Sequence, residues 1–126
     1  MPIVTMTVRQ PKSEAFKSMV LDTVHEALVA SGVHPNDLFQ RVLELRRENF
    51  RFDPRFPDLA KGRTDDFILL EIMLGLGRSV KVKRKVLSDI MEGLKAHGID
   101  PEHVMVCFID IPWENWSPGG GRLPHA

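Results

Sequence analysis

The sequence predicts an α+β fold in which a tandem β-α-β repeat forms a four-stranded sheet with two helices on one face. Residues 3–8 alternate apolar residues with threonine, which is the period of a strand. Two later segments carry apolar residues at helical spacing, and each lies between a serine and a glycine that suit helix ends. The two halves of the chain also match each other at an offset of 66 positions, which indicates an internal repeat.

The repeat includes the helix caps, the apolar stripe of each helix and the turn that follows it. The matching pairs are Ser13 with Ser79, Lys17 with Lys83, Val20 with Val86, Val24 with Ile90, Leu28 with Leu94, Gly32 with Gly98 and Pro35 with Pro101. Each unit is long enough for its two strands to pair in parallel through a crossover helix. We therefore expect two similar units with the same internal order.

The expected organisation is a single domain over residues 1–126. Its parts are a first β-α-β unit (1–48), a linker (49–65), a second β-α-β unit (66–111) and a tail (112–126). The four strands are expected at about 3–8, 38–47, 66–74 and 103–111. The linker and the tail are rich in proline and glycine and have no sustained period.

Composition excludes several classes of function. Lys+Arg 17 balances Asp+Glu 17, so no overall charge favours nucleic acid or a membrane surface. No apolar run approaches the roughly 20 residues that span a bilayer, and no signal peptide is visible, so we expect a cytoplasmic protein. Five histidines and one cysteine lack the spacing of a metal site, and we expect no metal. The single cysteine, Cys107, cannot form an internal disulfide and is expected in the core.

The third and fourth expected strands are apolar at both alternations, which is typical of strands buried on both faces. Two helices can cover only one face of a four-stranded sheet. Another subunit is therefore expected on the second face. The alternative is that the loops and the tail cover it.

The amino terminus carries a candidate catalytic group. Removal of Met1 would leave Pro2 as a terminal secondary amine, whose reference pKa as an α-amino group is roughly 7.7–8.0. A cationic or apolar pocket would lower that pKa, and a base near neutrality on a rigid strand can transfer protons. The alternative is a second-position proline with no chemical role.

Several short motifs resemble those of the tautomerase superfamily, in particular its fused, double-length members. His25-Glu26-Ala27, Asp37 with Phe39-Gln40, and the tail Trp116-Ser117 with Gly119, Gly121 and Arg122 are similar to segments of malonate semialdehyde decarboxylase. Gly77-Arg78-Ser79 is similar to the turn before the second helix in cis-3-chloroacrylic acid dehalogenase. Their order agrees with the tandem repeat.

The resemblance implies a catalytic amino-terminal proline (Pro2), an arginine that binds the substrate carboxylate (Arg78), an assisting carboxylate (Asp37) and a homotrimer. His25 matches a catalytic histidine of the dehalogenase only if a gap is allowed, so it stays a possible site residue. Both related enzymes carry two arginines in the turn before the second helix, whereas residues 75–77 here are Gly-Leu-Gly. Lys12, Arg46 and Arg122 are the candidates for the missing cation.

Arg78, Asp37 and Trp116 each have a structural interpretation besides a role in the site. Arg78 precedes a helix N-terminus, where free N–H groups favour an anion, and its guanidinium can bind a carboxylate with two hydrogen bonds. It could also be an exposed loop arginine. Asp37 could orient water or stabilise a protonated Pro2, or it could only begin a turn. Phe39 and Trp116 are candidate pocket walls, with tail anchoring as the alternative for the tryptophan.

The leading hypothesis is a cofactor-independent tautomerase that acts on a small 2-oxo or enol carboxylate, with Pro2 as acid and base. The second is a decarboxylase or hydratase of the malonate semialdehyde decarboxylase type, in which Pro2 works protonated and Asp37 is required. The third is a binding or assembly protein of the same fold, which retention of Met1 would favour. The sequence does not identify the substrate.

Overall fold

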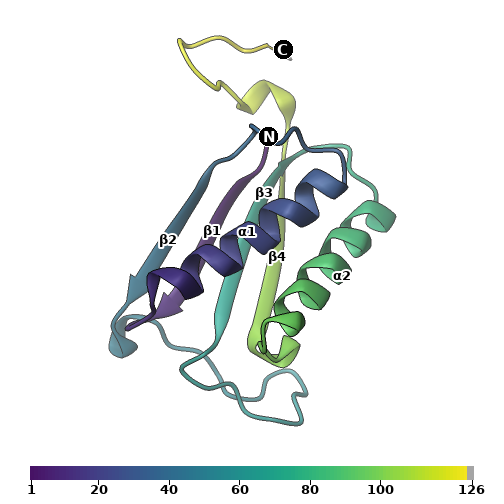
Figure 1. The fold of residues 1–126 in the computed structure, drawn as a ribbon. Coiled ribbons are helices and arrows are strands. Elements are labelled where there is room, and N and C mark those ends of the chain that lie inside the picture. Colours follow the sequence, from purple (N-terminus) through teal and green to yellow (C-terminus); the bar gives the residue numbers. More distant parts are fainter. Residues whose placement is uncertain (125–126) are drawn as a thin grey trace.

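Two β-α-β units follow each other along the chain in the computed structural model, which describes residues 1–124 (Figure 1). The main elements are β1 (Ile3–Arg9), α1 (Glu14–Ala30), β2 (Gln40–Leu45), β3 (Ile68–Gly75), α2 (Val80–Ala96) and β4 (Val104–Ile111). The strand order is β2-β1-β3-β4, with parallel outer pairs and an antiparallel central pair. Both helices lie on one face of the sheet (Figure 1). The predicted fold class is therefore confirmed.

The repeat continues beyond the helices. α1 and α2 each contain 17 residues and begin 66 positions apart. Short 3₁₀ helices follow β2 and β4, at Arg47–Asn49 and Trp113–Asn115, again 66 positions apart. The chain thus places equivalent residues at opposite ends of the sheet, because the two units run antiparallel to each other across β1 and β3.

The helices begin and end at the residues that the sequence indicates. Ser13 and Ser79 each accept a hydrogen bond from the N–H three residues later, with N···O distances of 3.0 and 3.2 Å. These bonds satisfy donors that a helix N-terminus leaves free. Gly32 and Gly98 follow the helices with φ of +110° and +83°, a conformation that favours glycine.

The core lies between the helices and the sheet. Its buried apolar side chains are Val4, Met6 and Val8 of β1, Val20, Val24 and Leu28 of α1, Ile68, Leu70, Ile72 and Leu74 of β3, and Val86, Ile90 and Leu94 of α2. Burial of each leucine or isoleucine contributes about 1.5–3 kcal/mol relative to exposure. Within residues 1–124, no helix is long and apolar enough to cross a membrane.

The two helices are in close contact at Gly93 of α2. A Cβ atom there would lie 2.6 Å from Cγ2 of Thr23 on α1. Thr23 is buried, and its hydroxyl donates a 2.8 Å hydrogen bond to the Met19 carbonyl, which holds the side chain in place. Glycine at position 93 is therefore required by packing.

Gly93→Ala is expected to lower the free energy of unfolding by up to about 2 kcal/mol, measured by urea denaturation. The overpacking cost of about 1–3 kcal/mol exceeds the gain in helix propensity of about 1 kcal/mol. Thr23→Ser is the matched background, because it removes the Cγ2 methyl that the new Cβ would strike. Equal destabilisation in both backgrounds would show that this contact is not the cause.

The second face of the sheet is largely uncovered in the single chain. Leu43 and Met105 are 42% and 43% exposed there, and Cys107 is also exposed. The expectation that Cys107 lies in the core is therefore wrong for the single chain, because alternate residues of β4 point away from the helices. We call this surface the open face.

The linker covers one end of the open face. Phe50 stacks on Phe67 with ring centroids 5.7 Å apart, and Phe52 lies 4.5 Å from the same ring. Phe67 is buried as a result. The segment that lacks periodicity thus has an ordered structure, which is held by these aromatic contacts and by turn hydrogen bonds such as that from the Arg63 N–H to the Pro54 carbonyl at 2.7 Å.

Two strands are shorter than the sequence predicts. β2 begins at Gln40 and ends at Leu45, against an expectation of about 38–47. The chain turns at its end, where the Asn49 N–H donates to the Arg46 carbonyl at 2.9 Å. β3 begins at Ile68 rather than 66, because the Phe67 N–H donates to the Thr64 carbonyl in a preceding turn.

Lys17 of α1 joins the helix to β2. Its Nζ lies 2.9 Å from Glu44 Oε1 and 2.8 Å from Glu14 Oε1. The hydrogen bond from Lys17, followed by that from the Lys12 backbone N–H, lowers the pKa of the Glu44 carboxyl below its ordinary value of 4.5. A carboxyl whose pKa is lower in the folded chain stabilises the fold above its ordinary pKa, and this contribution is lost as the pH falls.

Glu44→Gln is expected to flatten the fall of the thermal unfolding midpoint as the pH drops from about 5 to 3. Glu14→Gln is the matched control, because Glu14 binds the same lysine but is 91% exposed, whereas Glu44 is 25% exposed. We expect the control to follow the wild-type curve closely. An unchanged pH dependence in Glu44→Gln would contradict the assignment.

Candidate active site

The amino terminus lies in a partly enclosed position beside a carboxylate. The Met1 ammonium nitrogen is 2.9 Å from Asp37 Oδ2, and the Met1 and Asp37 side chains are 7% and 24% exposed. Asp37 precedes β2, and its own N–H closes a turn onto the His34 carbonyl at 2.9 Å. The Val4 N–H donates to the Phe39 carbonyl at 2.9 Å, which fixes the Asp37 segment alongside the start of β1.

Pro2 follows Met1 directly and is buried at the start of the central strand β1. Its nitrogen is an amide while Met1 is attached. Removal of Met1 would move the chain terminus by one residue, a step of about 3.8 Å between Cα atoms. In the chain that retains Met1, Asp37 contacts the Met1 ammonium group, and Pro2 is the adjacent residue.

Arg78 lies at the same end of the sheet, because β3 runs antiparallel to β1 and pairs Met73 with Ile3. The turn after β3 includes Gly77, with φ of +115°. Arg78 Nη1 donates to Ser31 Oγ at 3.2 Å, which connects the turn to the end of α1. A guanidinium has five N–H donors, so others can bind an anion.

An aromatic pair connects the tail to this end of the molecule. Phe39 and Trp116 form an edge-to-face contact with ring centroids 6.5 Å apart. Phe39 is half exposed. The tail also packs closely against Gly75, where a Cβ atom would lie 2.5 Å from the Trp113 ring. Both contacts hold the start of the tail at the end of the sheet where the amino terminus lies, and the rest of the tail extends beyond that end (Figure 1).

Arg41 is a candidate that sequence reasoning missed. Its Nε donates to Thr5 Oγ1 at 2.8 Å, which places it on the open face of β2. With Ile3 and Phe39 it lines a surface hollow of about 380 Å³ near the amino terminus. Side chains alternate between the two faces of a strand, and this alternation could have indicated Arg41. It assigns this charged residue to the face opposite the helices.

His25 supports the loop that carries Asp37. Its Nε2 donates to the Pro35 carbonyl at 2.9 Å, two residues before Asp37. The contact joins α1 to the loop and gives His25 a structural position near the site.

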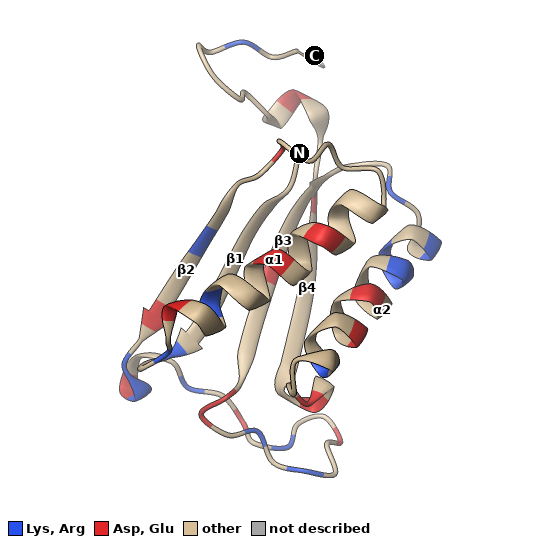
Figure 2. Ribbon diagram, in the orientation of Figure 1, with Lys and Arg blue, Asp and Glu red and all other residues tan. Residues whose placement is uncertain are grey.

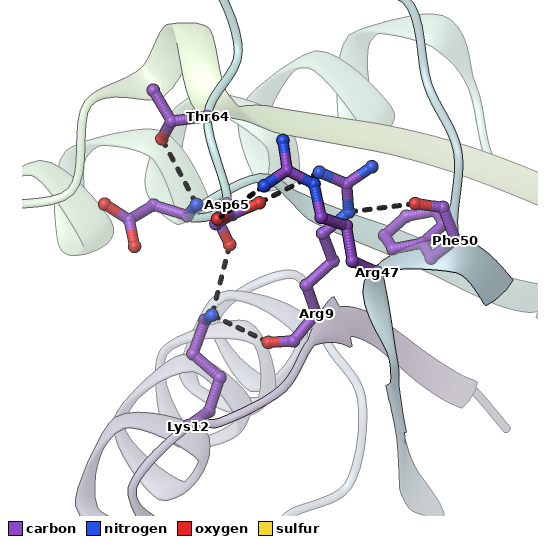
Figure 3. Close-up of polar contacts among 7 residues, drawn as sticks. Arg9, Lys12, Arg47, Phe50, Thr64 and Asp65 are labelled. Carbon is purple, nitrogen blue, oxygen red and sulfur yellow. Dashed lines mark hydrogen bonds and ion pairs between the residues drawn. The ribbon is translucent and has the colours of Figure 1, made fainter.

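Lys12 lies just after β1, at the end of the sheet opposite the amino terminus, and Figure 3 shows its contacts. Its Nζ donates to the Arg9 and Asp65 carbonyls at 2.7 and 3.1 Å. Arg9 Nη1 also lies 2.9 Å from Asp65 Oδ1, and its Nε donates to the Phe50 carbonyl at 2.9 Å. Within one chain, Lys12 therefore binds the linker and is not brought beside Pro2.

The other two proposed cations are exposed: Arg46 follows β2 at its far end from Asp37, and Arg122 lies in the tail. Arg122 is exposed in the tail, where its N–H donates to the Gly119 carbonyl at 3.4 Å. Arg46 is exposed and lies 3.3 Å from Glu48. The structure thus brings together Pro2, Asp37, Phe39 and Trp116 and places Arg78 at the same end of the sheet, but it does not bring Lys12 or Arg46 there.

Basic residues crowd the first turns of α2, as Figure 2 shows in blue. Lys83 Nζ binds Asp110 Oδ2 at 2.8 Å, and Lys85 Nζ binds Asp89 Oδ2 at 2.6 Å. These ion pairs support the interpretation of a structural, solvated face. Among the described residues, no group of three or more His, Cys, Asp or Glu side chains could hold a metal ion.

The fold and this site define a class of protein: a tandem β-α-β chain whose partly buried amino terminus faces a carboxylate. Residues 37–119, more than half of the chain, match the family model described as tautomerase enzyme. The chain belongs to the tautomerase superfamily.

Relatives of known name agree with this assignment. The probable tautomerase YusQ of Bacillus subtilis (strain 168) is 27% identical over 124 residues, which cover 97% of this chain and 96% of that protein. Malonate semialdehyde decarboxylase has a similar structure, with 26% identity, a TM-score of 0.86 and coverage of 96% of this chain and 93% of that chain. A fused 4-OT that forms a symmetric trimer shares the fold at 20% identity and a TM-score of 0.75, over 95% and 94% of the two chains.

Proposed function

We propose that the protein is a cofactor-independent tautomerase that uses Pro2 as acid and base on a small 2-oxo or enol carboxylate. One observation carries the proposal: the chain terminus is held at 2.9 Å from Asp37, next to the buried Pro2. After removal of Met1, the new terminus is the secondary amine of Pro2, one residue closer to the central strand β1. The superfamily assignment supports proton transfer as the chemistry.

The proposed reaction needs three functions from the chain. Arg78 binds the substrate carboxylate through its remaining N–H donors. The neutral Pro2 nitrogen removes a proton from the enol hydroxyl or from the carbon next to the carbonyl. The protonated proline then returns that proton to the other position, so that no proton is gained or lost overall. Phe39 and Trp116 form an apolar wall beside this position.

Arg41 is proposed as the second cation that the turn before α2 lacks. It lines the hollow beside Ile3 and Phe39, where a second polar group of the substrate could lie. Lys12 and Arg46 are poor candidates within one chain, because their contacts lie at the far end of the sheet and on its surface.

A second candidate is a decarboxylase or hydratase, which the Asp37 contact favours. A carboxylate near the amine stabilises its protonated form, and that mechanism requires a protonated Pro2. The similarity to malonate semialdehyde decarboxylase supports this alternative at the level of the fold and the overall sequence.

Asp37→Asn separates the two candidates. If Pro2 acts as a neutral base, the variant is expected to keep ketonisation of an enol arylpyruvate within about tenfold of wild type, because the lost carboxylate is not a proton carrier. If Pro2 must be protonated, decarboxylation of malonate semialdehyde should fall by roughly 10²–10⁴-fold. Both reactions are followed by ultraviolet absorbance or coupled assay, with the exposed Asp22→Asn of α1 as control. A ketonisation rate that collapses while wild-type decarboxylation is fast would reject the tautomerase proposal.

We further propose that the chain assembles as a homotrimer through the open face. Its exposed apolar residues, including Leu43 and Met105, support a protein partner there. The similar fold of the trimeric fused 4-OT supports this stoichiometry.

A further inference from the structure

Arg78 lies between the ends of the two helices. It precedes the N-terminus of α2, and its Nη1 donates to Ser31 Oγ at 3.2 Å, at the C-terminus of α1. The last turn of α1 contains no basic residue, whereas the last turn of α2 contains Lys95. The carbonyl groups at a helix C-terminus favour a cation. Arg78, which belongs to the second unit, therefore supplies the positive charge that the end of α1 lacks.

The Ser31 hydroxyl is held as an acceptor for Arg78. Its O–H donates to the Leu28 carbonyl at 2.6 Å. The Ser31 backbone N–H donates to the Ala27 and Leu28 carbonyls at 3.2 and 3.0 Å. A serine hydroxyl has one donor and two acceptor lone pairs, so Ser31 has only lone pairs left for the guanidinium. Ser31 is thus a fixed acceptor on the last turn of α1.

The rest of the Arg78 guanidinium has no partner in the single chain. Within residues 1–124, Ser31 Oγ is the one group that forms a hydrogen bond or ion pair with it. The contact engages Nη1 and leaves the edge formed by Nε and Nη2. This edge presents two parallel N–H donors, which match the two oxygens of a carboxylate. Arg78 is partly buried, so its orientation decides whether this edge is available to a ligand.

The internal repeat shows that the contact belongs to one end of the sheet. The equivalents of Ser31 and Arg78, 66 positions away, are His97 and Lys12. His97 Nδ1 donates to a carbonyl of its own helix at 2.9 Å, as the Ser31 hydroxyl does. Lys12 Nζ instead donates to carbonyls of β1 and the linker. The contact between Ser31 and Arg78 is therefore found at the end that carries Pro2, and the architecture of the repeat does not require it.

We propose that Ser31 is a positioning residue, which holds the Arg78 guanidinium so that its Nε–Nη2 edge faces the substrate carboxylate. The inference rests on the proposed function, in which Arg78 binds that carboxylate. An arginine side chain has several rotatable bonds, and ordering them only when substrate binds weakens the binding. A hydrogen bond that already restrains the guanidinium reduces this cost. Ser31 acts through Arg78 and needs no contact with the reacting atoms.

The test is a double-mutant cycle on protein whose intact mass shows that Met1 is absent, with ketonisation of an enol arylpyruvate as the assay. Ser31→Ala is expected to raise KM by about 3–10-fold, as for loss of one hydrogen bond, and to leave kcat within about twofold of wild type. In the Arg78→Ala background, the same substitution should change KM less than about twofold. A purely structural role for Ser31 would give similar losses in both backgrounds.

The controls separate the hydroxyl from the end of the helix. Ser31→Thr should keep KM within about twofold of wild type, because threonine retains the hydroxyl. His97→Ala removes a side-chain hydrogen bond at the equivalent end of α2 and should leave KM unchanged. Ser31→Gly removes the same hydroxyl and suits a helix end, so it takes the place of Ser31→Ala if that variant does not fold.

The possible failures of the two proposals can be told apart. An unchanged KM in Ser31→Ala, alongside a raised KM in Arg78→Ala, would overturn the positioning role and leave the proposed function intact. Equal losses from Ser31→Ala in both backgrounds would also overturn it. An unchanged KM in Arg78→Ala would contradict the role of Arg78 in the proposed function, and the role of Ser31 would fall with it.

Discussion

Pro2→Ala is expected to lower kcat/KM for ketonisation of an enol arylpyruvate by about 10²–10⁴-fold, the usual contribution of a positioned acid–base group. The expected loss is large because Pro2 is proposed as the only proton carrier in the reaction. Alanine at position 2 also permits removal of Met1, so the variant retains a free terminal amine. It differs from wild type in the secondary amine and in the rigidity of the ring.

The measurement is made on protein whose intact mass shows that Met1 is absent. Wild type and Pro2→Ala are compared across pH, with circular dichroism to show that both are folded. A wild-type pH limb that is missing in the variant would assign the titrating group to Pro2. Equal rates in both proteins would contradict its proposed role.

Arg78→Ala is expected to lower kcat/KM by about 10–150-fold, because a hydrogen bond to a charged group is worth roughly 1.5–3 kcal/mol. The loss should appear mainly as a higher KM, since Arg78 is proposed to bind the carboxylate in both the ground state and the transition state. Arg78→Lys should recover part of the activity, because it keeps the charge and loses the planar fork.

Arg84→Ala is the matched control for Arg78. Arg84 is exposed on α2, the helix that Arg78 precedes, and carries the same charge. Its removal is expected to change kcat/KM less than twofold at physiological ionic strength, because exposed charges are strongly screened. Similar losses in both variants would indicate general electrostatic attraction instead of a carboxylate contact.

Much of the fold could be predicted because its determinants are local. Ser13, Ser79, Gly32 and Gly98 each act within one turn of a helix, and the sequence shows them directly. The repeat then constrains the topology, because two matching units must bury matching apolar stripes. The ends of β2 were predicted less well, since the turn at Arg47 depends on hydrogen bonds that leave no pattern in the sequence.

The exposure of Cys107 shows a second reason why a prediction from the sequence can fail. A strand with apolar residues on both faces predicts burial on both faces, and the single chain buries only one. The sequence encodes surfaces that the chain does not cover by itself. Whether an apolar residue of such a strand is buried in the single chain can be decided only once the two faces of the sheet are assigned.

The positions of the candidate site residues depend on which distant segments pair in the sheet. Pro2, Asp37 and Arg78 belong to different elements, and the strand pairings bring them to one end of the sheet. Lys12 is the repeat equivalent of Arg78, so the same topology places it at the other end. Arg41 was missed because a single arginine in a short strand is ordinary in sequence.

The central claim is that a free amine at Pro2, beside Asp37, is the proton carrier. The most direct measurement compares the wild-type chain with and without Met1 in the same enol arylpyruvate assay, with intact mass to establish each form. Every side chain from position 2 onward is then identical, and the amide or amine at Pro2 is the relevant difference. The account predicts rapid ketonisation by the chain without Met1 and a rate at least 100-fold lower when Met1 is retained, as expected for loss of an acid–base group. Equal rates for the two forms would contradict it.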